Sequence, residues 1–173
     1  MDMKQFEVLA RYNIWATQKL TEALLNVSES DFSRPCGLFF NSICGTLNHI
    51  LVGEHYLWYS RFVKLPIPDD LKLNSIIETD KKEILNLLNQ KSHNWVVFLA
   101  QFQDKRFPKQ LDYITSAGKP MSLSYVDVLL HVFQHSTHHR EQITAALTIM
   151  GYPCPELDLV YMLAEESKVL DSV

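Results

Sequence analysis

Apolar residues recur about every 3.6 positions along four long stretches of the chain, which is the spacing that buries one face of an α-helix. The first stretch spans about residues 2–26 and contains neither glycine nor proline. The second begins at Ser42 or Gly45 and continues to about Lys64, beyond which prolines end the pattern. Residues 28–44 hold proline, glycine and polar side chains, and they are predicted to connect these two helices.

Two further long helices are predicted in the second half of the chain. Ser75 and Glu78 stand at the spacing of a capping box. In this motif, each of the two side chains accepts a hydrogen bond from the backbone N–H of the other residue at the start of a helix. They predict that the third helix begins there. The fourth helix is expected from about Ser124 to Gly151, because glycine at the end of a periodic stretch favours helix termination.

Two smaller elements complete the predicted fold. Residues 107–122 indicate a short two-stranded excursion around a turn at Gly118. A short fifth helix is expected over about residues 156–166. The pattern therefore predicts an all-α fold, a four-helix bundle with a short C-terminal fifth helix, and the length suits one domain over residues 1–173.

Composition and charge narrow the classes of function. The net charge of -4, the pI near 5.9 and the lack of any Lys/Arg block argue against a nucleic-acid partner. No basic and apolar leader opens the sequence and no apolar run approaches the length of a membrane span, so a cytoplasmic protein that does not enter a membrane is expected. The three cysteines, Cys36, Cys44 and Cys154, form no disulfide pattern and are expected to pack as small apolar residues.

Four of the seven histidines, His131, His135, His138 and His139, fall within the predicted fourth helix. Helical residues four positions apart lie on one face, so His135 and His139 can direct two imidazoles at one point, and so can His131 and His135. Two such imidazoles form half of a zinc-like or nickel-like site. The spacing matches that of the zinc-protease motif, but Ser136 replaces the general-base glutamate, which excludes that class.

A histidine pair at this spacing also occurs by chance, so a metal site needs a third ligand from another helix. The candidates are His49, His55 and His93. His49 lies beside the buried stripe marked by Leu47 and Ile50, where a polar side chain needs a partner, and it is our choice. His55 lies one residue off this stripe and is expected to be exposed. His93 has polar neighbours and is expected to be solvated.

At this point the residues match a known family. The matching segments are Arg11-Tyr-Asn-x-Trp15-Ala-x-x-Lys19-Leu20, Thr46-Leu47-Asn48-His49-Ile50 with Glu54 and Trp58, His131-Val-x-x-His135-Ser-Thr-His138-His139-Arg140-x-Gln142-Ile143, Gly151-Tyr-Pro, and Asp158-Leu. From about residue 8 to 162 the chain resembles the DinB-like family, whose superfamily includes YfiT-type thiol transferases and the mycothiol-dependent maleylpyruvate isomerase. The sequence departs from the family at Glu141, where a glycine is common; this carboxylate could alter local packing but removes no ligand.

The resemblance implies a four-helix bundle, usually a homodimer, that holds a divalent ion between three histidines. By matching position these are His49, His135 and His139. Three imidazoles leave a coordination position open, which is typical of catalytic sites. An open position can activate water, as in a hydrolase, or bind and deprotonate a thiol.

Family members resembling this chain transfer a small-molecule thiol, so the resemblance implies a metal-dependent thiol S-transferase with zinc or nickel as the ion and a thiol and an electrophile as substrates. No protein nucleophile is required, and no catalytic side chain is assigned. The alternative is a non-catalytic dimeric protein that binds a metal or ligand under stress.

Residues near the predicted ligands have more than one interpretation. Asp158 is favoured over Glu54 and Glu141 as the carboxylate that orients a ligand, and the alternative for Asp158 is a favourable first-turn charge. Arg140 could bind an anion, although an ion pair is its simplest role. His131 is expected to line the pocket or to face solvent or a partner, and His138 is expected to be solvated. The aromatic residues Tyr12, Trp15 and Trp58 are expected in the core.

Overall fold

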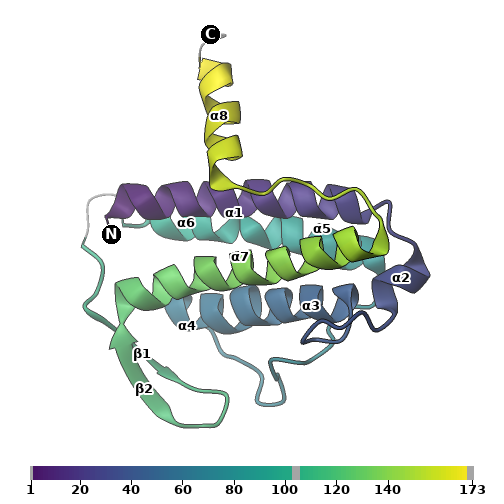
Figure 1. The fold of residues 1–173 in the computed structure, drawn as a ribbon. Helices are drawn as coiled ribbons and strands as arrows, with labels where there is room; N and C mark the ends of the chain where they lie inside the picture. The colour runs from purple at the N-terminus through teal and green to yellow at the C-terminus, as the bar shows by residue number, and fades with distance from the viewer. Residues whose placement is uncertain (1, 103–105, 171–173) are drawn as a thin grey trace.

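The computed structural model describes residues 2–102 and 106–170, and it shows four helical stretches lying side by side with a small hairpin at one end (Figure 1). The stretches are α1 (Met3–Leu24), the continuous run of α3 (Ile43–Ile50), η1 (Leu51–Trp58) and α4 (Tyr59–Val63), the pair α5 (Lys81–Ser92) and α6 (Asn94–Ala100), and α7 (Tyr125–Met150). The prediction of an all-α bundle is confirmed.

Local capping sets several of the helix boundaries. The Ser42 side chain accepts a hydrogen bond from the backbone of Gly45 at the start of α3, and Ser124 caps α7 in the same way. Gly151 ends α7 in the left-handed region with φ of 80°. The predicted bounds of the fourth helix are therefore confirmed, and of the two starts considered for the second helix the first is correct.

The start of the third helical stretch differs from the prediction. Asp80 caps α5 through its side chain, whereas Ser75 and Glu78 form no capping box. The backbone N–H groups of Ile77 and Glu78 instead donate to the buried Asn48 side-chain oxygen at 2.6 and 2.9 Å. The prediction was wrong because this long-range contact holds the segment in an extended conformation.

The second stretch contains a π-helix, η1, over residues 51–58. A π-helical turn holds more residues than an α-helical turn and shifts the buried face. Residues 51–55 are consequently all buried, including Glu54 and His55, which are 1% and 5% exposed. The predicted exposure of His55 was wrong because it extended the α-helical period across this segment.

The predicted two-stranded excursion is an antiparallel hairpin of β1 (Gln110–Ile114) and β2 (Pro120–Ser124). Leu111 pairs with Leu123 and Ile114 with Pro120, and Gly118 takes a φ of 75° in the turn. Only alternate residues of β1 reach the bundle, so the hairpin leaves one face to solvent.

Two short helices lie outside the four long stretches. The helix α2 (Glu29–Ser33) forms within the predicted connector and was not expected. The helix α8 (Leu159–Leu170) starts later than predicted and projects away from the bundle (Figure 1). An exposed ion pair of 2.8 Å between Arg11 and Glu166 connects it to α1.

The apolar core consists of two clusters with a polar layer between them. Along α1, η1 and α7, buried polar residues fall between the members of one cluster and those of the other. These residues are Asn13, Glu54, Ser136 and Arg140. None of the helices in the described part of the chain is long and apolar enough to cross a membrane.

Candidate metal centre

Three histidines from two helices converge between α3 and α7. The Nε2 atom of His135 lies 3.0 Å from Nε2 of His49 and 3.2 Å from Nε2 of His139. Within the described residues these three side chains form a group that could hold a metal ion, with all ligand atoms within 4.8 Å of one another. The structure therefore brings the predicted ligands together, and metal binding itself stays a prediction.

Hydrogen bonds fix which ring nitrogen faces the centre. His49 Nδ1 lies 2.8 Å from the backbone oxygen of Leu73, and His139 Nδ1 lies 2.8 Å from the side-chain oxygen of Gln142. Both partners only accept hydrogen bonds, so each Nδ1 carries the proton and each Nε2 keeps a free lone pair. This is the tautomer that a metal ligand bound through Nε2 requires.

The local environment keeps these imidazoles neutral. Burial, supported by repulsion from the neighbouring histidines, lowers the pKa of His135 to about 3. Burial also lowers the pKa of His139 to about 4, although the hydrogen bond to Gln142 opposes this shift. Both side chains are therefore unprotonated at neutral pH, as metal ligation demands.

The spacing of the nitrogens also fits a bound ion. Nitrogen ligands about 2.0–2.1 Å from a tetrahedral ion stand roughly 3.3 Å from one another. The observed Nε2 separations of 3.0 and 3.2 Å are close to this value. Donor type, tautomer and separation thus all fit a divalent metal ion with a position left open.

Phe40 supports the first ligand from the loop before α3. Its ring stacks on the His49 ring with centroids 3.7 Å apart and planes at 15°. This loop passes so close to α3 that a Cβ on Gly45 would lie 2.0 Å from the Phe40 backbone oxygen. Gly45 therefore permits the contact. Sequence reasoning missed both residues because the contact depends on the path of the loop.

Gly53 lies beneath the ligands on the adjacent turn of the helix. A Cβ at this position would stand 3.3 Å from Cε1 of His135 and 3.9 Å from Cε1 of His49. The absence of a side chain here lets the two rings approach the helix backbone. A glycine inside a helical pattern, one turn after the predicted ligand His49, was the signal that could have found it.

Asp158 and Glu141 do not orient the ligands. Both side chains are exposed, and no described hydrogen bond joins either to a histidine. Gln142 and a backbone carbonyl take this role instead. The preference for Asp158 was wrong because α8, which begins next to it, turns away from the bundle.

A buried polar network adjoins the centre. Arg140 is 2% exposed and donates to the Asn13 side-chain oxygen at 2.6 Å, while the Asn13 amide donates to Glu54 at 2.6 Å. The predicted ion pair of Arg140 is therefore not a direct contact, because Asn13 bridges the two charges. Glu54 also accepts hydrogen bonds from Trp95 at 2.9 Å and from Ser136, the residue after His135.

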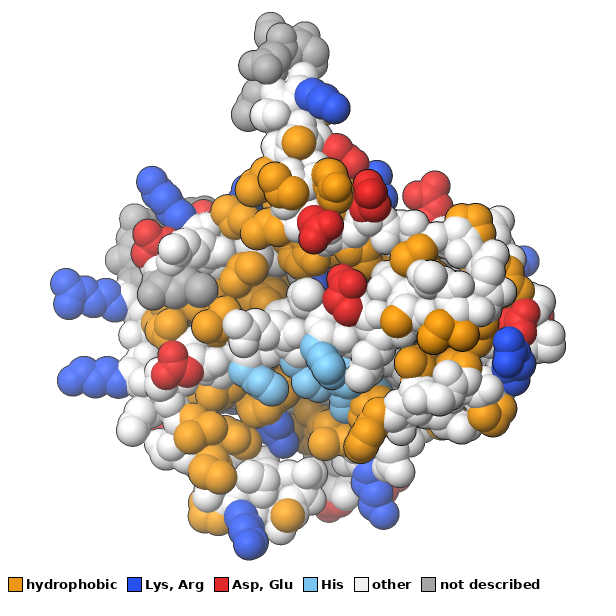
Figure 2. Space-filling view, in the orientation of Figure 1, with side chains coloured by type: hydrophobic (Ala, Val, Ile, Leu, Met, Phe, Trp, Pro, Cys, Tyr) orange, Lys and Arg blue, Asp and Glu red, His pale blue; other side chains and the backbone are white. Residues whose placement is uncertain are grey.

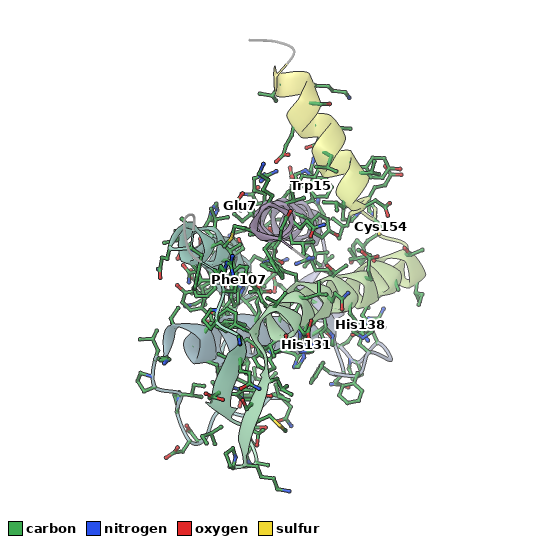
Figure 3. All side chains as sticks on the ribbon, turned by 90° about the vertical axis from the view of Figure 1, so that its left-hand side faces the viewer. Glu7, Trp15, Phe107, His131, His138 and Cys154 are labelled. Carbon is green, nitrogen blue, oxygen red and sulfur yellow. The ribbon has the colours of Figure 1, made fainter. Side chains whose placement is uncertain are left out.

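Three of the other histidines lie toward the surface, whereas His55 is buried. His131 and His138 are exposed on α7, with His131 nearer the hairpin (Figure 3). The His131 ring lies 5.5 Å from the His135 ring and 5.4 Å from the half-buried Trp58 ring. The expected solvation of His138 and His93 is confirmed by their exposure.

The packing expectations hold only in part. Tyr12 lies in the core, whereas Trp15 and Trp58 are half-buried. Cys44 is buried among apolar residues, but Cys154 is exposed, contrary to the prediction, since it lies in the segment that leaves α7.

A helical bundle that gathers three neutral histidines between two of its helices defines a class of candidate metalloproteins. The model of the DinB family matches residues 1–168, and the chain belongs to this family. The chain is also 28% identical over 155 residues to Protein DinB of Bacillus subtilis (strain 168), a match that covers 87% of this chain and 88% of that protein. The family resemblance found in the sequence is thus confirmed.

Proposed function

We propose that the protein is a metal-dependent enzyme that binds zinc or nickel through His49, His135 and His139 and transfers a low-molecular-weight thiol to an electrophile. The observation that carries this proposal is the convergence of three Nε2 atoms, with the His49 and His139 rings held in the ligating tautomer by their Nδ1 hydrogen bonds. Membership of the DinB family supports it.

The chain's own residues explain how such a site would work. A divalent ion held by His49, His135 and His139 would supply an open position that lowers the pKa of a bound thiol. In the proposed transfer the sulfur would form a bond to the electrophilic carbon, the leaving group would depart with the electron pair of its own bond to that carbon, and the thiol proton would pass to solvent. The hydrogen bonds to Leu73 and Gln142 hold His49 and His139 in place throughout.

Access from solvent supports turnover. Histidine side chains gather at the surface in the middle of one face of the molecule (Figure 2). His135 itself is only partly buried, and the neighbouring His131 and His138 are exposed. The proposed site therefore lies close to the molecular surface on this face.

Metal content is the first test. Untagged wild-type protein and a His135→Ala/His139→Ala variant are measured by inductively coupled plasma mass spectrometry. We expect about one ion per chain in the wild type and none in the variant, because removal of two of three ligands leaves no chelating set. The lack of metal in both proteins, even after reconstitution, would contradict the proposed site.

Turnover is the second test. The metal-loaded protein is screened with pairs of thiols and electrophiles, and the reconstituted double variant serves as the control. Thiol consumption by the wild type alone supports the transferase. Stoichiometric metal without turnover in a broad screen would favour the alternative of a non-catalytic metal-binding or ligand-binding protein.

A further inference from the structure

A large cavity lies between the hairpin and the end of the second helical stretch. Its volume is about 1020 Å³, and its walls come from α4, the loop over residues 64–71 and the strand β1. Two basic side chains, Arg61 and Lys64, line it, together with two acidic ones, Asp69 and Asp112. None of the ligand histidines contributes to its lining, so the cavity is a second feature beside the metal centre.

Arg61 is held rigidly in this cavity by two aromatic rings. The guanidinium carbon lies 4.5 Å from the centroid of the Trp58 ring and 4.8 Å from that of the Tyr113 ring. Such contacts between a cation and two π systems fix the orientation of the planar group. The position of the charge is thus set before any ligand binds.

Most of the hydrogen-bonding capacity of Arg61 is unused. A guanidinium has five N–H donors, yet the one hydrogen bond described for this group is a long contact of 3.4 Å from Nη2 to the backbone oxygen of Ile114. Its Nε is buried and has no partner among the described residues. The Nη groups are not among the buried unpaired atoms, so they are the donors that this cavity offers to a ligand.

No described carboxylate neutralises this cation. Asp69 and Asp112 line the same cavity, but neither lies within ion-pair distance of Arg61 in the described residues. Asp112 alternates with Tyr113 along β1, so its side chain leaves the opposite face of the strand. Burial also lowers the pKa of Arg61, as expected for a charge that lacks a counter-ion.

The cation is connected to the metal centre by a short series of ring contacts. The His135 ring contacts the His131 ring, and the His131 ring contacts that of Trp58, with centroids 5.5 and 5.4 Å apart. The Arg61 guanidinium in turn lies over the face of the Trp58 ring.

We propose that Arg61 is a specificity-determining residue that binds a carboxylate of the small-molecule thiol whose sulfur reaches the metal centre. The identification of the ligand as a thiol rests on the proposed function, whereas the anion site at Arg61 does not depend on it. A carboxylate matches the planar fork of a guanidinium through two parallel hydrogen bonds. The two acidic residues of the cavity lining offset the two basic ones, which favours a singly charged carboxylate over a doubly charged phosphate.

The test compares two thiols that differ only in the carboxylate, N-acetylcysteine and N-acetylcysteine amide. Their binding to the zinc-loaded protein is measured by calorimetry. We expect the acid to bind about tenfold more tightly than the amide, the scale of one charge-assisted hydrogen-bonding contact. Arg61→Met keeps the packing stem and should abolish this preference by weakening the acid alone.

Lys64→Met is the matched control, because it removes the other cation of the same cavity and should leave the preference intact. If Arg61→Met fails to fold, Arg61→Lys replaces it and should lose most of the preference, since an ammonium cannot form the two parallel hydrogen bonds. Equal affinities for acid and amide in the wild type, or an unchanged preference in the Arg61 variant, would overturn the inference.

A metal-free measurement separates this inference from the proposed function. N-acetylalanine and its amide carry no thiol, and their binding to metal-free protein is followed through tryptophan resonances in NMR spectra. A preference for the acid that depends on Arg61 upholds the anion site, even if neither thiol binds to the zinc-loaded protein and the transferase proposal fails. Binding of both thiols to zinc without any preference for the acid would overturn the anion site and leave the proposed function standing.

Discussion

At the scale of single residues, Gly53 offers a way to weaken metal binding without weakening the fold. A methyl group there would stand 3.3 Å from Cε1 of His135, so the imidazole must move by a few tenths of an ångström. Alanine also favours a helix over glycine by about 1 kcal/mol. We expect Gly53→Ala to lower zinc affinity about tenfold and to leave the stability of the metal-free protein unchanged or higher.

Competition with a chelating dye measures the affinity in this prediction, and thermal unfolding measures the stability. Gly45→Ala is the contrasting variant, because its Cβ would meet the Phe40 backbone oxygen at 2.0 Å and the loop would have to move. Unlike Gly53→Ala, Gly45→Ala should therefore lower the stability of the metal-free protein. Equal zinc affinity in wild type and Gly53→Ala would show that His135 has room to adjust.

At the scale of elements, Glu54 joins the four helical stretches across the polar layer. It accepts hydrogen bonds from Asn13 on α1, Trp95 on α6 and Ser136 on α7. Glu54→Gln removes the negative charge that offsets the buried Arg140, and a buried charge left without compensation costs about 3–5 kcal/mol. We expect the free energy of unfolding, measured by urea denaturation, to fall by roughly this amount.

Glu166→Gln is the control for this prediction, since it removes a carboxylate from the exposed ion pair with Arg11. Pairs of this kind contribute about 0–1 kcal/mol because water and salt screen them. Comparable losses of stability in the two variants would mean that the polar layer contributes no more than a surface contact.

Periodicity predicted the long helices well, because each one buries a single continuous stripe. It failed where another interaction competes with that stripe. The π-helix moved His55 inward, and the Asn48 side chain held residues 77 and 78 in an extended conformation. Neither effect has a marker within the local pattern of apolar residues.

In the candidate site too, local spacing was predictable from the sequence and long-range contacts were not. His135 and His139 could be found because their spacing on one helix already brings them together, and the choice of His49 followed from its place beside a buried stripe. The Phe40 ring and the Leu73 carbonyl could not be predicted from the sequence, because both approach the histidines from loops whose path depends on tertiary contacts. The role of Arg61 could not be predicted from the sequence, because its contact with Tyr113 depends on the position of the hairpin.

At the scale of the whole molecule, the buried histidines should make stability depend on pH. The unfolded chain takes up protons near the ordinary histidine pKa of about 6.5, whereas the folded chain resists protonation until the pKa values of about 4 for His139 and about 3 for His135. Between these limits the unfolded state binds more protons. The metal-free protein should therefore lose stability as the pH falls from 6.5 toward 4.

Urea denaturation at a series of pH values measures this dependence, with a slope of up to about 1.4 kcal/mol per pH unit for each histidine. The His135→Ala/His139→Ala variant should show a shallower slope, and the part that remains comes from His49 and His55, whose pKa values are also lowered by burial. Identical slopes for the two proteins would assign the dependence to other groups.

The ligand set joins positions 86 residues apart, with His49 on an early helix and His135 and His139 on the last long one. During synthesis the ribosome releases α1, α3 and α5 well before α7 emerges, so a nascent chain has at most one of the three imidazoles in place. The chelating set closes only when α7 docks against α3. Under the proposed function, metal binding is consequently a late event in folding, and a chain that stops before α7 would lack two of the three proposed ligands.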